Sequence, residues 1–256
     1  MRGLDDGCLN TGATGCAERI EAFYAALWNR NVTVDFAHPT GDLSSYDLVI
    51  APSLYLAGQA ASKNLTGYVR DGGHLVVSYF SGIVDLNDTV YPGAAPGALR
   101  EVLGLTIPEF LPLHENETVT LSDSRTGAAW TDDIEVTTAE VLAWYVDGPA
   151  AGGPAITRNA FGAGSAWYLS TKLVGSDLGS LLMDALNAAG IDAAHGIGVV
   201  EVVTRSTDTE DFHFHINHTD ADHAVPATGT ELLTNTPVDG TLLVPAGLTR
   251  VVRTTR

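Results

Sequence analysis

A short apolar run between glycine turns constrains the fold of this chain more than any other stretch. Leu75 to Tyr79 follows Gly72-Gly73 and is closed by Ser81-Gly82. A run of this kind is typical of a strand buried on both faces in the middle of a parallel sheet. Ligands of open α/β sheets bind beyond the carboxyl ends of such strands. Phe80 and Ser81 are therefore the first residues to consider for chemistry.

Helices and strands alternate around this run. The spacing of apolar residues predicts helices at 18–29, 59–70 and 175–189. Apolar runs bounded by turn residues predict strands at 32–36 and 46–52. This alternation implies right-handed crossovers and a doubly wound, mostly parallel sheet. After a long loop at 83–96, mostly antiparallel strands are expected at 118–121, 140–145, 155–159 and 165–170.

The chain divides into three parts by pattern. Residues 1–17 form a head without apolar periodicity, which we expect to be disordered. We expect its Cys8 and Cys16 to be free thiols, because a structural zinc site needs four ligands. The α/β domain spans 18–198. From residue 199 the apolar period changes to two, which predicts a small all-β sandwich domain at 199–256. No cofactor is expected.

The charge excludes several classes of partner. A formal net charge of -18 repels the phosphates of nucleic acid and anionic membrane surfaces. No apolar run approaches the roughly 20 residues that span a bilayer, and the first residues lack the features of a signal peptide. We expect a soluble, cytoplasmic protein. Lysine is nearly absent, which adaptation to high salt and a GC-rich genome would each explain.

Histidines form one constellation in the last domain. His213 and His215 alternate with Phe212, Phe214 and Ile216, so the two imidazoles share one face of a predicted strand. Paired imidazoles near a carboxylate can hold zinc or nickel. The preferred interpretation is a strand with its aromatic face inward and its imidazoles in water. His213 and His215 are therefore only candidates for a metal site.

Several strings together resemble the family 42 glycoside hydrolases, which are β-galactosidases. The resemblance runs from about Glu18 to the C-terminus and leaves out residues 1–17. The strings that carry it occur in the order found in the family: Asn31 to Pro39, Leu48 to Tyr55, Gly73 to Asp85, Pro96 to Arg100, Phe161 to Tyr168 and Ile216 to Thr219. The resemblance implies a domain similar to class I glutamine amidotransferases that mediates trimerisation, followed by a C-terminal β domain.

The resemblance also implies where catalysis takes place. In that family two glutamates on an N-terminal (β/α)8 barrel cleave the substrate, and a barrel needs on the order of 250 residues. No residue here matches them, so we expect a non-catalytic part of a β-galactosidase that forms a homotrimer and partners a barrel domain outside this chain. Asn116-Glu117 imitates the Asn-Glu pair of such barrels, but its polar setting predicts an exposed turn.

Two alternatives remain open. The first is a stand-alone sugar- or metal-binding module that acts through the tail domain. The second is a residual amidotransferase-type hydrolase with Ser81 as its nucleophile, since active relatives place a cysteine on the turn after the central strand. Against the second, the sequence gives His114-Glu115 no reason to lie opposite Ser81, and a serine that caps a turn is the simpler interpretation.

Overall fold

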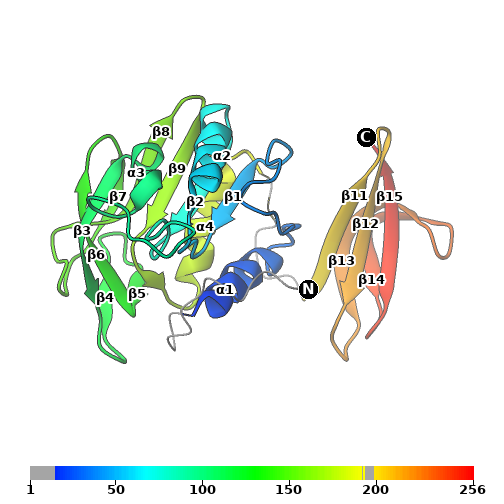
Figure 1. The fold of residues 1–256 in the computed structure, drawn as a ribbon. Coiled ribbons are helices and arrows are strands. Elements are labelled where there is room, and N and C mark those ends of the chain that lie inside the picture. The colour runs from blue at the N-terminus through cyan, green and yellow to red at the C-terminus, as the bar shows by residue number, and fades with distance from the viewer. Residues whose placement is uncertain (1–14, 192, 194–198) are drawn as a thin grey trace. The chain divides into compact units, whose positions relative to one another are not determined.

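The computed structural model describes residues 15–191, 193 and 199–256. The chain divides into two compact units, shown in Figure 1. The first comprises Met1–Phe23 with Phe36–Asp192, and the second comprises Tyr24–Asp35 with Ala193–Arg256. The predicted head lies outside the described residues up to position 14, and helix α1 (Cys16–Trp28) begins within its last residues.

A five-stranded sheet forms the centre of the first unit. Its strands are β1 (Leu48–Ala51), β2 (His74–Ser78), β9 (Gly164–Leu169), β8 (Pro154–Phe161) and β7 (Glu140–Trp144), in that order. β1, β2 and β9 are parallel neighbours, whereas β8 pairs antiparallel with both β9 and β7. The sheet is therefore mixed, with two parallel and two antiparallel pairs, because the tight turn between β8 and β9 can join only antiparallel strands.

The run that begins at Leu75 is an interior strand of this sheet, between β1 and β9, and is buried on both faces as its pattern predicts. Leu75 and Val77 join one core cluster with Leu65 and Val69 of helix α2 (Gln59–Arg70). Val76 points to the opposite face and is only 1% exposed. Both faces of β2 are covered, and helix α4 (Asp177–Ala188) also contacts this strand.

Smaller sheets and helices complete the first unit. Two strands that the sequence pattern did not predict, β3 (Leu105–Pro112) and β6 (Trp130–Val136), form an antiparallel pair. The strand predicted at 32–36 is wrong: no ladder forms there. The remaining elements are the helices η2 (Gly97–Leu99) and α3 (Arg100–Leu103), and a three-stranded sheet of β4 (Thr118–Thr120), β5 (Thr126–Ala128) and β10 (Lys172–Leu173).

The second unit is all-β apart from the end of α1, consistent with the predicted sandwich domain. Its five antiparallel strands hydrogen-bond in the order β11-β12-β15-β13-β14. The strands are β11 (Val200–Ser206), β12 (Glu210–Asn217), β13 (His223–Glu231), β14 (Thr236–Val244) and β15 (Thr249–Thr255). The glycines predicted as the domain boundary, at 196 and 198, lie outside the described residues.

Within the described part of the chain, no helix is both long and apolar enough to cross a membrane.

Candidate functional site

The backbone turns sharply after β2, where a ligand of an α/β sheet is expected. Phe80 stands at the turn with φ 62°, a conformation that side-chain-bearing residues rarely adopt. Ser81 follows and is 1% exposed. Its hydroxyl oxygen accepts the backbone N–H of Leu54 at 3.0 Å. The strained position is therefore filled by a phenyl ring, and the serine supports the neighbouring loop.

Aromatic rings gather over this turn. The Phe80 ring lies 4.2 Å from that of Trp130, and Phe110 lies 5.6 Å from Trp130 between ring centroids. Tyr79 also stacks on Trp130, at 6.1 Å between ring centroids and with nearly parallel planes. Contacts at these distances add stability beyond the burial of area. The carboxyl end of β2 is thus packed with side chains of the same chain.

Arg19 of α1 brings a buried positive charge to the same end of the sheet. Its Nε donates to the carbonyl oxygen of Pro52 at 2.9 Å, and an Nη donates to the hydroxyl of Ser78. The guanidinium lies 3.8 Å from the centroid of the Tyr79 ring, within cation–π range. Burial lowers the pKa of Arg19 and the nearby Tyr79 opposes that effect.

Asp132 of β6 is the matching buried acid. One carboxylate oxygen accepts the indole N–H of Trp130 at 2.7 Å, and the other accepts the hydroxyl of Tyr168 at 2.8 Å. Burial raises the pKa of Asp132 to about 7, although both hydrogen bonds oppose the rise. Burial and the neighbouring Asp132 raise the pKa of Tyr168 well above its ordinary value. This carboxyl can lose its proton near neutral pH, but it faces only side chains of its own chain.

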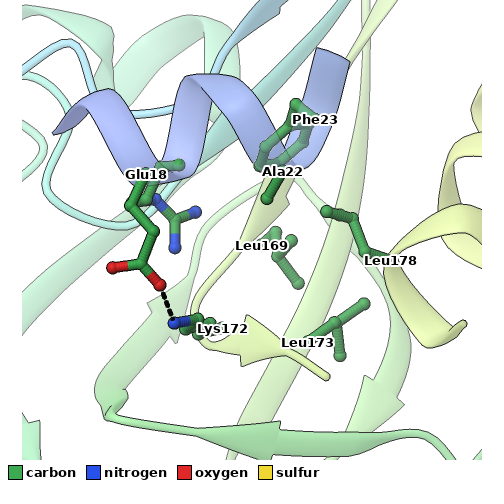
Figure 2. Close-up of a pocket in the computed structure, with 8 residues that line it drawn as sticks. Glu18, Ala22, Phe23, Leu169, Lys172, Leu173 and Leu178 are labelled. Atoms are coloured by element: carbon green, nitrogen blue, oxygen red, sulfur yellow. Dashed lines mark hydrogen bonds and ion pairs between the residues drawn. The ribbon is translucent and has the colours of Figure 1, made fainter. Parts of the chain in front are cut away.

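A small pocket lies between α1 and the end of β9, as Figure 2 shows. Lys172 closes one side by donating to Glu18 at 2.5 Å. The cavity volume of about 30 Å³ holds roughly two water molecules, so a sugar ring does not fit. The lining residues are Glu18, Arg19, Ala22, Phe23, Leu169, Lys172, Leu173 and Leu178.

The two candidate metal ligands are held differently from each other. His213 bonds through its ring nitrogens to Thr204 at 3.0 Å and Thr254 at 3.2 Å. His215 is 5% exposed, and its Nδ1 has no partner among the described residues. Burial, followed by the neighbouring His213, lowers the pKa of His215. In the part of the chain that is described, no group of three or more His, Cys, Asp or Glu is placed to hold a metal.

The expectation that this imidazole face lies in water is wrong. His215 pairs across the sheet with Val202 and lies on the side of Val200 and Val252, which belong to the core of the second unit. The Phe212 face is half-buried instead. Threonine hydroxyls hold only the half-buried His213, and His215 is buried with no partner for its Nδ1 among the described residues. Period-two alternation therefore does not decide which face is inside.

Two family models match the chain in succession. The β-galactosidase trimerisation domain of glycoside hydrolase family 42 matches residues 9–192, and the β-galactosidase C-terminal domain matches residues 199–253. The chain belongs to the family 42 β-galactosidases.

Relatives of this family 42 chain agree with the assignment. A β-galactosidase of Arthrobacter sp is 37% identical over 235 residues, which is 91% of this chain and 34% of the relative. The β-galactosidase BgaB of Geobacillus sp. (strain Y412MC61) is 40% identical over 205 residues, 78% of this chain and 30% of the relative. This chain therefore spans about a third of the length of these curated relatives.

Solved structures show the same fold. The β-galactosidase from Bacillus circulans sp. alkalophilus superposes with a TM-score of 0.86 at 29% identity, covering 93% of this chain and 37% of that structure. The polyextremophilic β-galactosidase from the Antarctic haloarchaeon Halorubrum lacusprofundi gives 0.82 at 26% identity, covering 94% and 36%.

Asn116-Glu117 of this family 42 chain lies in a turn before β4, as its setting predicts. Asn116 has φ 65°, and a carboxylate oxygen of Glu117 accepts the backbone N–H of His114 at 2.9 Å. The glutamate thus closes its own turn, which is an ordinary structural use of the side chain.

Sequence patterns missed the two charges at the centre of the family 42 domain. Arg19 lies one helical turn before Phe23 on an otherwise apolar helix face. This spacing was the one feature of the sequence that indicated a buried arginine. Asp132 stands next to Asp133, and only the fold distinguishes the buried carboxyl from the exposed one.

Proposed function

We propose that this chain is the oligomerisation and C-terminal part of a β-galactosidase that acts as a homotrimer. On this proposal the carboxylates that cleave galactosides lie on a barrel domain outside these residues, and the chain has no catalytic residue of its own. The observation that carries the proposal is the trimerisation-domain match over residues 9–192. The filled turn after β2 supports the non-catalytic role, since Phe80 and Trp130 occupy the place where a substrate is expected.

The loop at 83–96 supplies the contact surface in this proposal. Asp85 accepts the backbone N–H groups of Asn87 at 2.8 Å and Thr89 at 3.0 Å, so the loop is internally bonded. Yet Leu86 is 75% exposed and Val90 is 68% exposed. Apolar side chains on an ordered loop gain about 25 cal/mol for each Å² that a neighbouring subunit covers.

The loop is also anchored in its second half. Tyr91 donates its hydroxyl hydrogen to the carbonyl of Ala57 at 2.5 Å, and Arg100 donates to the carbonyl of Pro92 at 2.7 Å. A segment held in this way loses little conformational entropy when it binds, which favours association.

Light scattering tests the proposal. We expect a mass about three times the 26.8 kDa of one chain. Replacing Leu86→Asp and Val90→Asp together is expected to yield monomers, because two desolvated charges would face the neighbour. The matched control replaces Leu233→Asp and Leu243→Asp, which are 65% and 55% exposed in the second unit, and should leave the trimer intact. A trimer that survives the loop variant would contradict the role of this loop.

An activity assay tests the non-catalytic assignment separately. The chain alone should release no nitrophenol from a nitrophenyl β-galactoside, and Ser81→Ala should change nothing. Turnover above background would show that catalytic groups lie within these residues.

The finer domain assignment is part of the same proposal. The parallel neighbours β1, β2 and β9 and the positive φ of Phe80 after β2 support an amidotransferase-like domain at 18–198, with the β domain at 199–256. Limited proteolysis should cut first near the junction of these domains and leave two resistant fragments. Early cleavage inside either domain would contradict these boundaries.

A further inference from the structure

A second apolar patch lies on the first unit, separate from the loop at 83–96. Trp144, the last residue of β7, is 46% exposed, and Val146 is 60% exposed. Residues two apart on an extended segment share a face, so the two side chains project together. Among the described residues of this unit, only the patch and the loop carry two exposed large apolar side chains within four residues of each other. Phe36 and Val136 stand singly.

The patch continues onto a neighbouring segment. Val146 donates its backbone N–H to the carbonyl of Thr120 at 2.8 Å, and the carbonyl of Trp144 accepts the backbone N–H of Ser122 at 2.9 Å. Thr120 and Ser122 are both exposed beside the two apolar residues. The hydroxyl oxygen of Ser122 accepts the backbone N–H of Trp144 at 3.0 Å, so its own hydrogen can be donated to another molecule.

The patch is uncharged on a strongly acidic chain. The acids at its border are bonded within the chain. Glu140 pairs with Arg158 at 2.9 Å. Asp123 pairs with Arg125 at 2.8 Å, and Asp147 accepts a backbone N–H at 2.7 Å. With a formal net charge of -18, most of the surface repels an approaching acidic segment. A patch of Trp, Val, Ser and Thr repels it less, so charge favours this place for an acidic segment to dock.

The loop that supplies the contact surface of the proposed trimer has the complementary character. Its tip is closed by an antiparallel bridge between Val84 and Val90. Leu86 and Asp88 lie between them and are exposed. Asp88 interacts with the hydroxyl of Tyr55, and its carboxylate has further acceptor sites. The tip therefore presents a leucine for an indole and a carboxylate for a serine hydroxyl.

Patch and loop lie at the same end of the central sheet. β2 and β9 are parallel, and β8 pairs antiparallel with both β9 and β7, so β7 runs in the direction of β2. The loop follows the carboxyl end of β2, and Trp144 ends β7. Two strands stand between β2 and β7, a separation of roughly 14 Å across the sheet. One subunit can therefore offer its loop to one neighbour and its patch to another.

A ring of three subunits needs two different surfaces on each subunit, because its contacts are heterologous. We propose that the patch of Thr120, Ser122, Trp144 and Val146 receives the loop at 83–96 of a second copy of this chain, and that three such contacts close the ring. This inference rests on the proposed trimer and names the surface that the loop meets. Trp is among the side chains most enriched at the energetic centres of interfaces, so Trp144 is the anchor.

Mixing two variants tests the contact in the full chain. The loop variant carries Leu86→Asp and Val90→Asp, and the patch variant carries Trp144→Asp and Val146→Asp. Each alone should sediment as a monomer of 26.8 kDa, because each lacks one half of every contact. In an equimolar mixture the intact loop of the patch variant meets the intact patch of the loop variant. One contact forms and the ring cannot close, so we expect a dimer of twice that mass and no trimer.

Two further variants control for folding. Val146→Asp alone keeps the partly buried Trp144, so it still reports on the contact where the double substitution unfolds the chain. It should give the same dimer when mixed with the loop variant. Val136→Asp changes another valine of the same unit, 41% exposed, and should leave the trimer intact.

The outcomes separate this inference from the proposed function. A loop variant that stays trimeric, or an original chain that is monomeric, contradicts the proposed role of the loop and the inference with it. A monomeric loop variant beside trimeric patch variants keeps the role of the loop and overturns its docking on Trp144. Variants that are monomeric alone and stay monomeric on mixing, or then form trimers, also overturn the docking, because the loop and the patch would not face each other.

Discussion

At the scale of single residues, the buried carboxyl of Asp132 couples the stability of the central domain to pH. Burial raises its pKa from 3.8 to about 7. The folded state therefore holds a proton that the unfolded state releases between about pH 4 and pH 7. Stability contributed by this group is complete below pH 4 and declines as pH rises through 7, by a few kcal/mol.

Asp132→Asn should remove this decline. The amide oxygen still accepts one hydrogen bond, and the hydroxyl of Tyr168 is able to accept from the amide nitrogen. Urea unfolding at pH 5 and pH 8 should show the variant gaining stability relative to the original chain at the higher pH. Asp133→Asn, exposed on the same strand, is the control. An equal difference at both pH values would contradict the assigned pKa of Asp132.

His215 predicts the opposite pH response in the second unit. Burial and His213 lower the pKa of His215 below its ordinary 6.5, so the unfolded state takes up a proton before the folded state does. The stability contributed by His215 is complete above pH 6.5 and declines as pH falls through the folded pKa. His215→Leu should reduce the fall in unfolding temperature that occurs as the pH is lowered below 6.5. The control is His218→Gln, because His218 is half-exposed and paired with Glu201. This substitution should leave the fall in unfolding temperature at low pH unchanged.

At the scale of elements, Gly82 sets the path from β2 into the loop at 83–96. Its φ is 68°, and a Cβ there would lie 2.3 Å from the backbone oxygen of Pro96. Gly82→Ala should therefore cost about 3 kcal/mol or more, from backbone strain and a clash that cannot relax cheaply. Gly152→Ala has a similar φ of 82° with nothing within 4 Å, and should cost only about 1–2 kcal/mol. Denaturant unfolding compares the two; equal losses would show that the Pro96 contact is unimportant.

Local signals predicted the elements that contain their own boundaries. α2 was predicted to the residue because Asp71-Gly72-Gly73 ends it. β2 was predicted one residue too late at each end, from the apolar run that glycine turns enclose. β3 and β6 were missed because acids at Glu109, Asp132 and Asp133 interrupt the alternation. Strand pairing depends on neighbours far apart in the chain, and no local pattern encodes that.

From the sequence, only one position was singled out for a site, the carboxyl end of β2 with Phe80 and Ser81. Aromatic rings of the same chain fill that position. The buried charges Arg19 and Asp132 arrive from elements 59 residues before and 54 residues after Ser78, counted along the sequence. Their partners are aromatic rings whose burial follows from tertiary packing. The inward face of His215 was mispredicted for the same reason.

At the scale of the whole molecule, the excess of acid governs the response to salt. The chain carries 31 Asp and Glu residues and only 13 Lys and Arg residues. Most carboxylates therefore have no basic partner, and they repel one another. The Debye length shortens from about 30 Å at 0.01 M salt to about 3 Å at 1 M. The unfolding temperature should therefore rise steeply with sodium chloride, because screening removes repulsion that is stronger in the compact state.

Part of this repulsion arises between two acidic residues on neighbouring strands. Glu109 and Asp133 are exposed and lie directly opposite each other on β3 and β6, where like charges destabilise a sheet. Asp133→Lys turns this contact into an attraction, so it should raise the unfolding temperature at low salt and lose most of that gain at 1 M. Asp239→Lys changes the net charge equally but lies opposite Thr228, and should gain less. If the two variants gain equally, the repulsion is spread over the whole surface; if neither gains, repulsion between Glu109 and Asp133 does not limit the stability of the fold.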